Sequence, residues 1–578
     1  MYIQKIFRPV LLIIIAIMLM VNPLNVIASA GALEDVRTLV KERYVDIVSD
    51  DILGSSTIED IIGQLGDPHS RYLTAKEYQS FVNSLNMSFS GIGIYMDIVP
   101  PGVKVTSVIK GSPAEEVGLK SGDVIITAAG QSLAGISAEG AASILRGLEG
   151  SSIELTVRRG EEEFRVTVTR RSIEMPTVNG EVLNGHIGYI EILSFGSNTS
   201  ELFGKTVADL KAKNVDSWVI DLRDNPGGYL DSVIDLAGYF IGTKVVVQTK
   251  DRSGTVSYPA KDHSTWNQPT VFLTNQNSAS ASEILTAAMK DYSKATIIGT
   301  KTYGKGTVQS MFSLSDGGVL KLTVARFFSP FGNVIDKEGI RPHISLLGAD
   351  AKSAAQLLLG EVSHESGDKA GKIKIMSGPN IFEFSLAKAR SEEYWQPYYE
   401  ILNGVGSSSN LKKGSANGFL SVSDSELEKR WPLFFPGYKE LNQLKDIPLD
   451  KKFTVRFSRS IDWSTVNTNS LELIESISGE RISLKFEPLT DTELRVIPEE
   501  KLQPSTSYWL MTHTQIKDRL GTPLSEGALS VVSTASVSGA VELDQSKFKA
   551  YNERNFKDYG LDYGYTIIDN MFRTYRQI

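Results

Sequence analysis

The stretch from Val271 to Gln309 constrains the fold of this chain more than any other part of its sequence. It contains two short apolar runs of the kind that form buried strands, Val271–Leu273 and Ala295–Ile298. Between them, Ala281–Met289 has the pattern of a helix, and a serine before it can serve as the N-cap. The stretch therefore predicts a β-α-β unit, in which the second strand returns beside the first.

The predicted unit carries two kinds of reactive side chain. A serine on the turn before the helix lies beside N-terminal N–H groups, which can stabilise an oxyanion. The glycine-flanked Lys305 lies at the far end of the unit, and the stretch has no histidine, so another base must be considered. Serines before helices are usually caps and lysines beside glycines are usually solvated. The residues alone do not choose among Ser278, Ser280 and Ser282.

Two motifs make the interpretation more specific. Asn277–Glu283 reads NSASASE and Tyr303–Gln309 reads YGKGTVQ, and both resemble the active-site segments of the C-terminal processing peptidases, or tail-specific proteases. A separate motif upstream, Trp218–Gly228, reads WVIDLRDNPGG and resembles the strand and glycine turn of the same family. The resemblance extends over roughly residues 35–345 and implies a serine peptidase with a Ser-Lys dyad.

The resemblance implies a role for each residue of the site. It identifies Ser280 as the nucleophile, Lys305 as the general base and Gln309 as the residue that orients the lysine amine. It also implies an oxyanion hole made by backbone N–H groups of Gly227 or Gly228 together with Ala281. A lysine acts as a base only when neutral, so its pKa must be lowered, and burial does this. Such chemistry needs no metal or cofactor, and we expect none.

Residues 87–172 resemble a PDZ domain, a module that adds an extended C-terminal peptide to the edge of a sheet. The resemblance implies a loop whose N–H groups bind the terminal carboxylate, formed by Phe89, Ser90, Gly91, Ile92 and Gly93. Ile92 and Ile94 share one face of the following strand and are expected to line a pocket for an apolar last side chain. Arg146, at the end of a predicted helix, is either a link between peptide binding and the active site or a solvated helix-end residue.

The composition excludes several other classes of protein. The chain has no cysteine, which excludes disulfides, a thiol nucleophile and thiolate metal sites. Its six histidines are scattered, without a metal-ligand spacing such as HExxH, so a metalloenzyme is not expected. The formal net charge of -8 gives no reason to expect nucleic acid as a partner.

Residues 1–30 have the pattern of a signal peptide. Lys5 and Arg8 form a positive segment, and Val10–Val21 is apolar but short for a membrane span. Ala28–Ala30 supplies the small residues for cleavage before Gly31. The sequence therefore predicts export to an extracellular or cell-envelope location, with an uncleaved anchor as the alternative.

The predicted fold class is multidomain α+β. The domains follow in the order signal peptide (1–30), helical N-terminal region (31–86), PDZ domain (87–172), α/β serine-peptidase core (173–347), linker or accessory region (348–446), all-β Ig-like sandwich (447–536) and unassigned tail (537–578). Residues 447–534 alternate as strands do and resemble the Ig-like module of bacterial S-layer-associated proteins, which implies a surface-exposed spacer or adhesion module. In the accessory region the sequence predicts a helix over Phe382–Leu402 and a mobile loop over Gly404–Asn417.

Together these features predict an exported endopeptidase that cleaves proteins near their C-termini and recognises those C-termini through its PDZ domain. Cell-wall or surface association through the Ig-like module and a homo-oligomer are further expectations. The alternative is a catalytically silent protein that uses its PDZ and Ig-like modules for peptide binding or surface anchoring. The complete set of Ser280, Lys305 and Gln309 favours the enzyme, because a pseudoenzyme tends to lose such a set.

Overall fold

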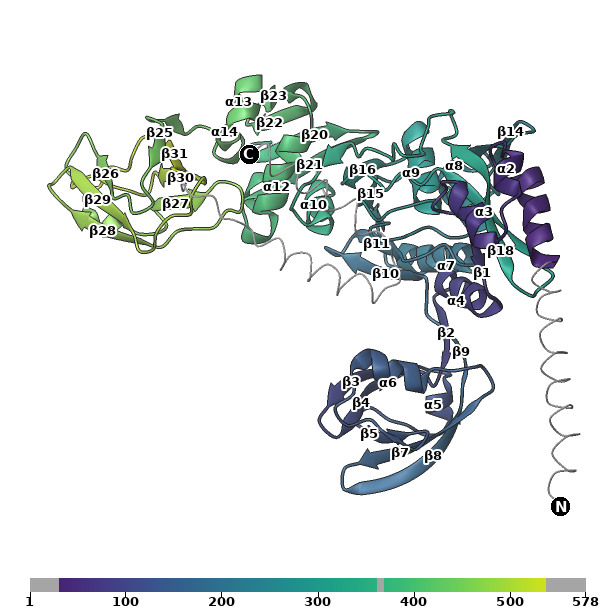
Figure 1. Cartoon of the computed structure of the whole chain (residues 1–578). Coiled ribbons are helices and arrows are strands. Elements are labelled where there is room, and N and C mark those ends of the chain that lie inside the picture. Colours follow the sequence, from purple (N-terminus) through teal and green to yellow (C-terminus); the bar gives the residue numbers. More distant parts are fainter. Residues whose placement is uncertain (1–30, 361–368, 537–578) are drawn as a thin grey trace, which may run out of the picture. The chain divides into compact units, whose positions relative to one another are not determined.

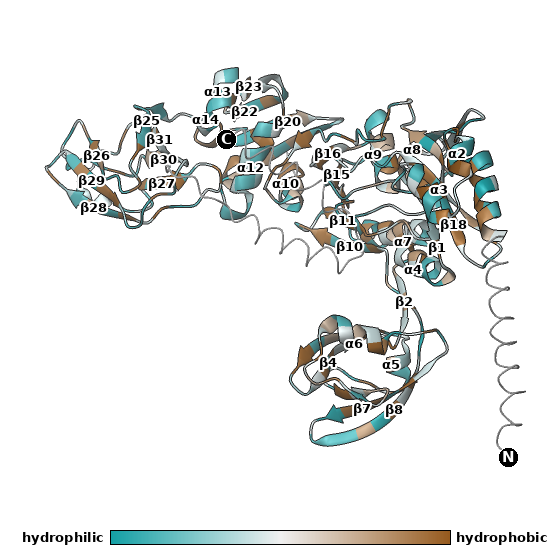
Figure 2. Cartoon of the chain, viewed as in Figure 1, coloured by the Kyte–Doolittle hydropathy of each residue, from teal (hydrophilic) through white to brown (hydrophobic). Residues whose placement is uncertain are grey.

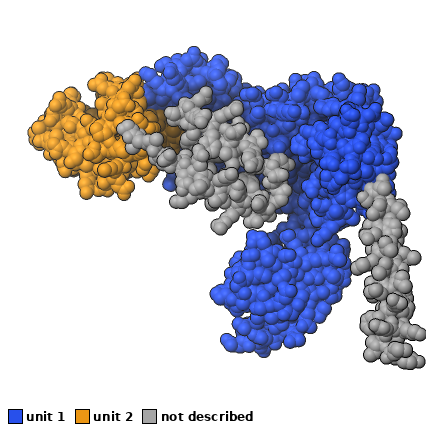
Figure 3. All heavy atoms as spheres, in the orientation of Figure 1, with its two compact units in different colours: residues 1–436 blue, residues 437–578 orange. Residues whose placement is uncertain are grey.

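The computed structural model describes residues 31–360 and 369–536 (Figure 1). The predicted signal peptide and the C-terminal tail lie outside the described residues. Tertiary contacts divide the chain into two compact units, and the boundary along the chain lies between Pro436 and Gly437 (Figure 3). No helix within the described ranges is long and apolar enough to cross a membrane.

The N-terminal region is helical, as predicted. A helix covers residues 31–43, and α2 (Asp50–Leu53), α3 (Ile58–Gln64) and α4 (Ala75–Leu85) follow. These helices carry hydrophobic and hydrophilic residues side by side (Figure 2). Apolar residues of the first helix, α2 and α3 pack with two buried leucines, Leu320 and Leu322, of the strand β18 (Val319–Phe328). Between α3 and α4, the short strand β1 (Arg71–Leu73) pairs antiparallel with β18. The region is therefore built onto the sheet that also carries the loop of Lys305.

The PDZ-like part is an antiparallel sheet of strand order β3-β4-β5-β7-β8, with β6 paired to β5. Its elements are β3 (Ile94–Val99), β4 (Gly102–Val108), α5 (Pro113–Glu116), β5 (Val124–Ala128), β6 (Gln131–Ser132), α6 (Ala138–Leu145), β7 (Ser152–Arg159) and β8 (Glu162–Thr169). A ribbon of β2 (Ser88–Gly91) and β9 (Arg171–Glu174) joins it to the rest of the unit. Among the described strands β3 pairs with β4 alone, so its other edge is open to an added strand.

The core of the first unit is a six-stranded sheet of order β10-β11-β12-β15-β16-β19. Its strands are β10 (Val178–Leu183), β11 (Ile187–Ile192), β12 (Ser217–Asp221), β15 (Thr270–Thr274), β16 (Thr296–Gly299) and β19 (Ile344–Ser345), and all neighbours except β10 and β11 run parallel. The helices α7 (Thr199–Lys211), α8 (Leu230–Ile241) and α9 (Ala281–Asp291) pack against the sheet through one apolar core. The predicted β-α-β unit is thus confirmed as β15, α9 and β16.

Parallel strands end at the same edge of a sheet, and this brings two turns together. The turn after β12 holds the glycines of the NPGG motif, and the turn after β15 holds the three serines. The N–H of Ala279 donates to the carbonyl of Asn225 at 3.0 Å, which joins the turns directly. Residues about fifty positions apart in sequence therefore form one site.

A second sheet follows the loop that contains Lys305. Its order is β1-β18-β13-β14, with β17 also paired to β18, and its further strands are β13 (Val245–Lys250), β14 (Thr255–Pro259), β17 (Thr307–Ser313) and β18 (Val319–Phe328). The chain passes from β16 of the core sheet through the loop 300–306 into β17. Lys305 therefore lies where the chain crosses from one sheet to the other.

The accessory region is folded, and two predictions for it are wrong. Its elements are α10 (Ala351–Leu358), β20 (Lys372–Ser377), β21 (Asn380–Ser385), α11 (Leu386–Ala389), α12 (Glu392–Gly404), η1 (Ser408–Asn410), β22 (Leu411–Ser415), β23 (Gly418–Ser421), α13 (Asp424–Lys429) and α14 (Trp431–Phe434). The predicted helix over 382–402 starts instead with strand β21, because Phe382 and Phe384 are buried with period two against β20. The predicted loop over 404–417 contains β22, which pairs with β20.

The second unit is all-β in its described residues, as predicted. One sheet has the order β24-β31-β30-β27 with β25 paired to β31, and the other has the order β26-β29-β28. The strands are β24 (Lys439–Glu440), β25 (Leu444–Ile447), β26 (Phe453–Arg456), β27 (Leu471–Glu475), β28 (Leu484–Pro488), β29 (Glu493–Pro498), β30 (Ser507–Thr512) and β31 (Ala528–Thr534), with the short helix η2 (Trp463–Thr465). An Ig-like identity for this unit stays a prediction.

Candidate active site

Ser280 lies on a sharp turn between β15 and α9. Its backbone has φ 56° and ψ -114°, a conformation that is rare for non-glycine residues and costs about 1–3 kcal/mol. Its N–H donates to Glu283 Oε2 at 3.0 Å, which holds the residue in this conformation. Ala281 begins the helix directly after it, so the positive end of the helix dipole lies at the serine.

The other two serines of the motif hold the turn together. Ser278 Oγ donates to the carbonyl of Leu222 at 2.7 Å, and Ser282 Oγ donates to the carbonyl of Asn225 at 3.0 Å. Both side chains are completely buried, whereas Ser280 is half-buried. The geometry thus gives Ser278 and Ser282 structural tasks and leaves Ser280 as the serine a substrate can reach.

Lys305 has the environment that a basic lysine requires. Burial lowers its pKa to about 8, and the positive charge of Lys321 acts in the same direction, while Glu283 and Asp67 oppose the shift. The flanking glycines allow the close packing that buries it, because a Cβ at Gly306 would lie 2.3 Å from the backbone nitrogen of Asp336. A substantial fraction of the amine is therefore neutral at mildly alkaline pH.

Glu283 connects the turn of the serine to the loop of the lysine. Its carboxylate is completely buried and accepts four hydrogen bonds. Oε2 accepts the N–H groups of Ser280 (3.0 Å) and Lys305 (2.8 Å). Oε1 accepts the N–H of Gly304 (2.7 Å) and the hydroxyl of Thr302 (2.6 Å). Burial raises the pKa of Glu283, and these hydrogen bonds act against that shift. One carboxylate thus sets the backbone of the nucleophile relative to that of the base.

The sequence analysis missed this role of Glu283. A glutamate three residues after a serine N-cap is the signature of a capping box, and that signal predicts only the bond to the N–H of Ser280. The three bonds to residues 302–305 depend on how the loop after β16 folds back over α9. The sequence carries no local signal for them.

Gln309 does not contact the lysine amine in this structure. Its Nε2 donates to Thr307 Oγ1 at 2.9 Å and to Thr323 Oγ1 at 3.3 Å. No hydrogen bond joins Lys305 Nζ to Gln309 or to Ser280 Oγ among the described residues. The orientation of the amine by Gln309 stays a prediction.

The hydrogen bonds of the glycine turn distinguish between Gly227 and Gly228, the two alternative partners of Ala281 in the expected oxyanion hole. The N–H of Gly227 donates to Asn225 Oδ1 at 2.8 Å and is therefore occupied. The N–H groups of Gly228 and Ala281 have no hydrogen-bond partner among the described residues. At Gly227 a Cβ would lie 2.8 Å from Ser280 Cβ, so only glycine allows the turn to approach the serine this closely. The geometry favours Gly228 with Ala281 as the pair of donors.

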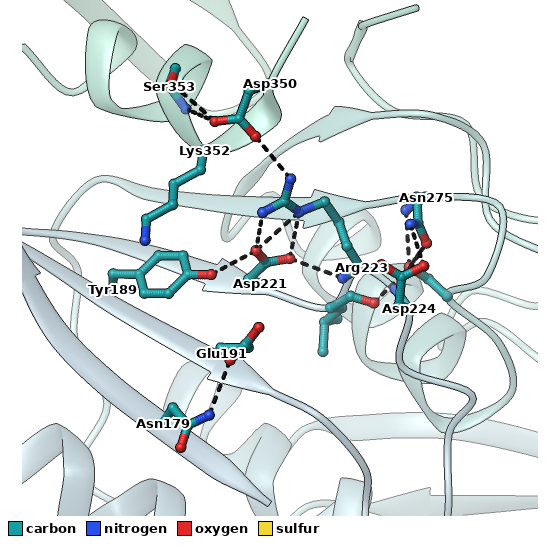
Figure 4. Close-up of polar contacts among 12 residues, drawn as sticks. Asn179, Tyr189, Glu191, Asp221, Arg223, Asp224, Asn275, Asp350, Lys352 and Ser353 are labelled. Carbon is teal, nitrogen blue, oxygen red and sulfur yellow. Dashed lines mark hydrogen bonds and ion pairs between the residues drawn. The ribbon is translucent and has the colours of Figure 1, made fainter. Parts of the chain in front are cut away.

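A polar network anchors the glycine turn at the end of β12 (Figure 4). The buried Asp221 accepts the hydroxyl of Tyr189 at 2.8 Å and the guanidinium of Arg223, whose closest contact is 2.6 Å. Arg223 also donates to Asp350 at 3.1 Å, at the start of α10. This network explains a carboxylate in an otherwise apolar strand, because each of its charges is paired.

The same turn is tied to the serine turn by a second pair of residues (Figure 4). Asn275 Oδ1 accepts the N–H of Asp224 at 3.0 Å, and Asn275 Nδ2 donates to Asp224 Oδ1 at 2.9 Å. Asp224 lies just before the NPGG motif and Asn275 lies just after β15. These bonds hold the oxyanion donors and the nucleophile in one rigid arrangement.

Most of the predicted carboxylate loop, residues 89–93, is strand: Phe89–Gly91 belong to β2 and pair with β9, and only Ile92 and Gly93 lie between β2 and β3. The carbonyls of Ile92 and Gly93 accept the N–H groups of Ala114 and Ile109, which fixes the loop. Ile92 is buried in the core of this part, and Ile94 packs against that core. Arg146 is exposed, and its guanidinium lies 5.1 Å from the centre of the Phe89 ring; a link from Arg146 to the active site stays a prediction.

The comparisons with known proteins agree with this arrangement. The model of peptidase family S41 matches residues 186–346, and a PDZ domain model matches residues 104–159. The chain is 33% identical over 341 residues to the carboxy-terminal processing protease CtpA of Bacillus subtilis. The alignment covers 58% of this chain and 72% of the relative. It is 34% identical over 337 residues to CtpB of the same organism, with 57% and 70% covered. It is 33% identical over 358 residues to a probable CtpA-like serine protease of Staphylococcus epidermidis, with 60% of this chain and 72% of the relative covered.

Because these alignments span most of each relative, the chain belongs to the carboxy-terminal processing proteases of peptidase family S41 and is a serine peptidase with a PDZ domain.

Proposed function

We propose that this protein cleaves other proteins near their C-termini with Ser280 as nucleophile and Lys305 as general base. The observation that carries the proposal is the single buried carboxylate of Glu283, which holds the backbone of both residues. The low pKa of Lys305, about 8, supports its role as the base.

The proposed reaction proceeds in two steps. The neutral amine of Lys305 takes the proton of Ser280 as its oxygen attacks the scissile carbonyl, and the N–H groups of Gly228 and Ala281 stabilise the oxyanion. The ammonium then gives its proton to the leaving amine, and an acyl-enzyme remains. Lys305 next takes a proton from the attacking water, and the serine is regenerated as the acid product leaves. Proton transfer needs Nζ within hydrogen-bond reach of Oγ, a contact expected to form with substrate bound.

The pH dependence of turnover follows from the base. Protonated Lys305 cannot accept a proton, so kcat/KM should rise about tenfold per pH unit below a pH of about 8 and level off above it. Initial rates on one fluorogenic peptide, measured across this range in buffers of constant ionic strength, check the expectation. A profile that is flat through this range would contradict the role of Lys305.

The Glu283→Gln variant should lower kcat by about tenfold to a hundredfold, since an amide NH2 would face two backbone N–H donors and displace the serine or the lysine. The variant should also move the rise of the pH profile to lower pH. The reason is that the negative charge of Glu283 raises the pKa of Lys305, and its removal lowers that pKa. A loss of activity without the shift in the profile would mean that Glu283 only stabilises the fold.

We propose further that the PDZ domain selects substrates by a free C-terminus. An extended peptide would pair with the open edge of β3, and the loop 89–93 would receive the terminal carboxylate. Burial of an apolar last side chain contributes about 1.5–3 kcal/mol, or one to two decades in affinity.

The test compares one substrate with a free apolar C-terminus, the same chain amidated, and the same chain ending in Asp. The free apolar form should be cleaved about tenfold faster than either other form. Equal rates for the three would leave a serine peptidase that does not read the ends of its substrates.

We also propose that the protein is exported and acts outside the cytoplasm. The support is the sequence of residues 1–30, with cleavage expected before Gly31. Association with the cell surface through the second unit, and a homo-oligomer, are the accompanying expectations. N-terminal sequencing of the mature protein from culture supernatant and cell-wall fractions tests export, and a mature chain that begins at Met1 in the cytoplasm would refute it.

A further inference from the structure

A cavity lies beside the sheet of β17 and β18, and Lys321 is the one residue of its lining that has been given a role above, in lowering the pKa of Lys305. Its volume is about 430 Å³, and it is bounded by β1, α4 and β18. The side chains that matter for its chemistry are Arg71, Lys76, Glu77, Ser80, Phe81 and Lys321. Three of these are cations and one is an anion. The excess of positive charge points to an anionic occupant.

The single carboxylate of the cavity does not neutralise the cations. Glu77 Oε2 accepts both the N–H and the hydroxyl of Thr74, each at 2.8 Å, as part of the capping box of α4. Its other oxygen pairs with Arg71 at 3.5 Å. Lys76 and Lys321 have no carboxylate within ion-pair distance among the described residues. Two cations of the cavity therefore have no ion pair among the described residues.

Lys321 is the less exposed of these two lysines. It is half-buried, and its ammonium lies 5.0 Å from the centre of the Phe81 ring. Burial and the nearby charge of Arg71 both lower its pKa, and the charge of Asp67 acts against them. A partly desolvated ammonium without an ion-paired carboxylate is costly, and a ligand carboxylate would remove that cost.

The cavity lies close to the hydrogen bond between Gln309 of β17 and Thr323 of β18. In the ladder, Lys321 of β18 lies opposite both Arg71 of β1 and Met311 of β17. Thr323, two residues further along β18, receives the hydrogen bond of Gln309. Alternate residues of a strand share a face, so Lys321 and the Gln309 contact lie on the same side of the sheet. The positive charge of Lys321 also reaches Lys305, where it helps to lower the pKa.

We propose that this cavity is a substrate subsite that binds a carboxylate of the polypeptide being cleaved. The carboxylate is an acidic side chain near the scissile bond, because the free α-carboxylate of the substrate is assigned to the PDZ domain. This inference rests on the proposed function and adds a preference for substrate charge to it. Arg71 supplies a planar donor for the carboxylate, and the two lysines supply charge from either side.

The test measures peptide binding to full-length protein carrying Ser280→Ala, so that turnover does not enter the readout. Peptides in matched pairs differ by Glu against Gln at one position at a time, and a further pair differs by a C-terminal acid against an amide. At least one internal Glu/Gln pair should differ by about five- to tenfold in Kd, and the difference should shrink at high salt. The affected position identifies the acidic side chain that the cavity binds, and the terminal pair is the control that reports on the PDZ domain.

Variants locate the effect in the cavity. Lys76→Gln and Lys321→Gln should each reduce that difference to about twofold or less, while Lys213→Gln, an exposed lysine outside the cavity, should preserve it. If Lys321→Gln fails to fold, Lys76→Gln decides alone, because Lys76 is exposed on α4. No discriminating internal pair, or a difference that survives Lys76→Gln, would overturn the proposal. Turnover by the unmodified protein is scored separately: its absence would refute the proposed function, and the binding result would still decide the role of the cavity.

Discussion

Ser280→Ala is expected to lower kcat by about four orders of magnitude or more while leaving the fold intact. The substitution removes only the attacking oxygen from a half-buried position. The N–H of residue 280 keeps its bond to Glu283, so the turn is retained. Hydrolysis of a fluorogenic peptide, with thermal unfolding followed by circular dichroism, measures both effects.

The neighbouring serines are the matched controls. Ser278→Ala and Ser282→Ala each remove a buried hydrogen bond to a carbonyl, at 2.7 Å and 3.0 Å, and should cost about 1–3 kcal/mol of unfolding free energy. Both variants should keep much more activity than Ser280→Ala. Turnover retained by purified Ser280→Ala, or abolished only in one of the controls, would assign the nucleophile elsewhere.

Lys305→Arg is expected to be inactive, with kcat/KM lowered by about three orders of magnitude or more, although the side chain keeps its positive charge. The guanidinium stays protonated at every accessible pH and cannot accept the proton of the serine. The measurement is kcat/KM from about pH 6 to about pH 10, a range that includes the lowered pKa of the native lysine.

Lys301→Arg serves as the control for this variant, because Lys301 is an exposed lysine of the same loop. It should keep activity within about twofold of the unmodified protein. Comparable turnover by Lys305→Arg would mean that another residue is the base.

The local elements of the site could be predicted from the sequence. The apolar run Val271–Leu273 became β15 with one further residue at each end, and the predicted helix Ala281–Met289 became α9 with two more residues. Hydrophobic periodicity and small polar turn residues are local signals, and they were sufficient here.

The choice among the three serines could not be predicted, because it depends on contacts between distant segments. Ser278 and Ser282 donate to carbonyls more than fifty residues earlier in the chain. Between the two glycines a local contact decides instead, because the side chain of Asn225 occupies the N–H of Gly227, two residues later, and leaves that of Gly228 open. The low pKa of Lys305 depends first on its burial and then on the charge of Lys321, which lies on a strand that the sequence does not place beside it.

In the accessory region, by contrast, the local secondary structure itself could not be predicted correctly. Its aromatic residues suggested one long helix, but Phe382 and Phe384 alternate with exposed or half-buried neighbours and pair with β20. The rest of the predicted helix is divided into two helices, Leu386–Ala389 and Glu392–Gly404. A strand and a helix that follow each other within about twenty residues give a mixed periodicity, which favours neither structure clearly.

The most direct test of the central claim is active-site labelling of the intact protein with a fluorophosphonate, a reagent that modifies activated serines. We expect one label, located at Ser280 by peptide mass mapping, with a labelling rate that rises with pH through about 8. Labelling should be lost in Lys305→Arg and kept in Lys301→Arg. A label on a different residue, or equal labelling of Ser280 in Lys305→Arg, would contradict a Ser280–Lys305 dyad.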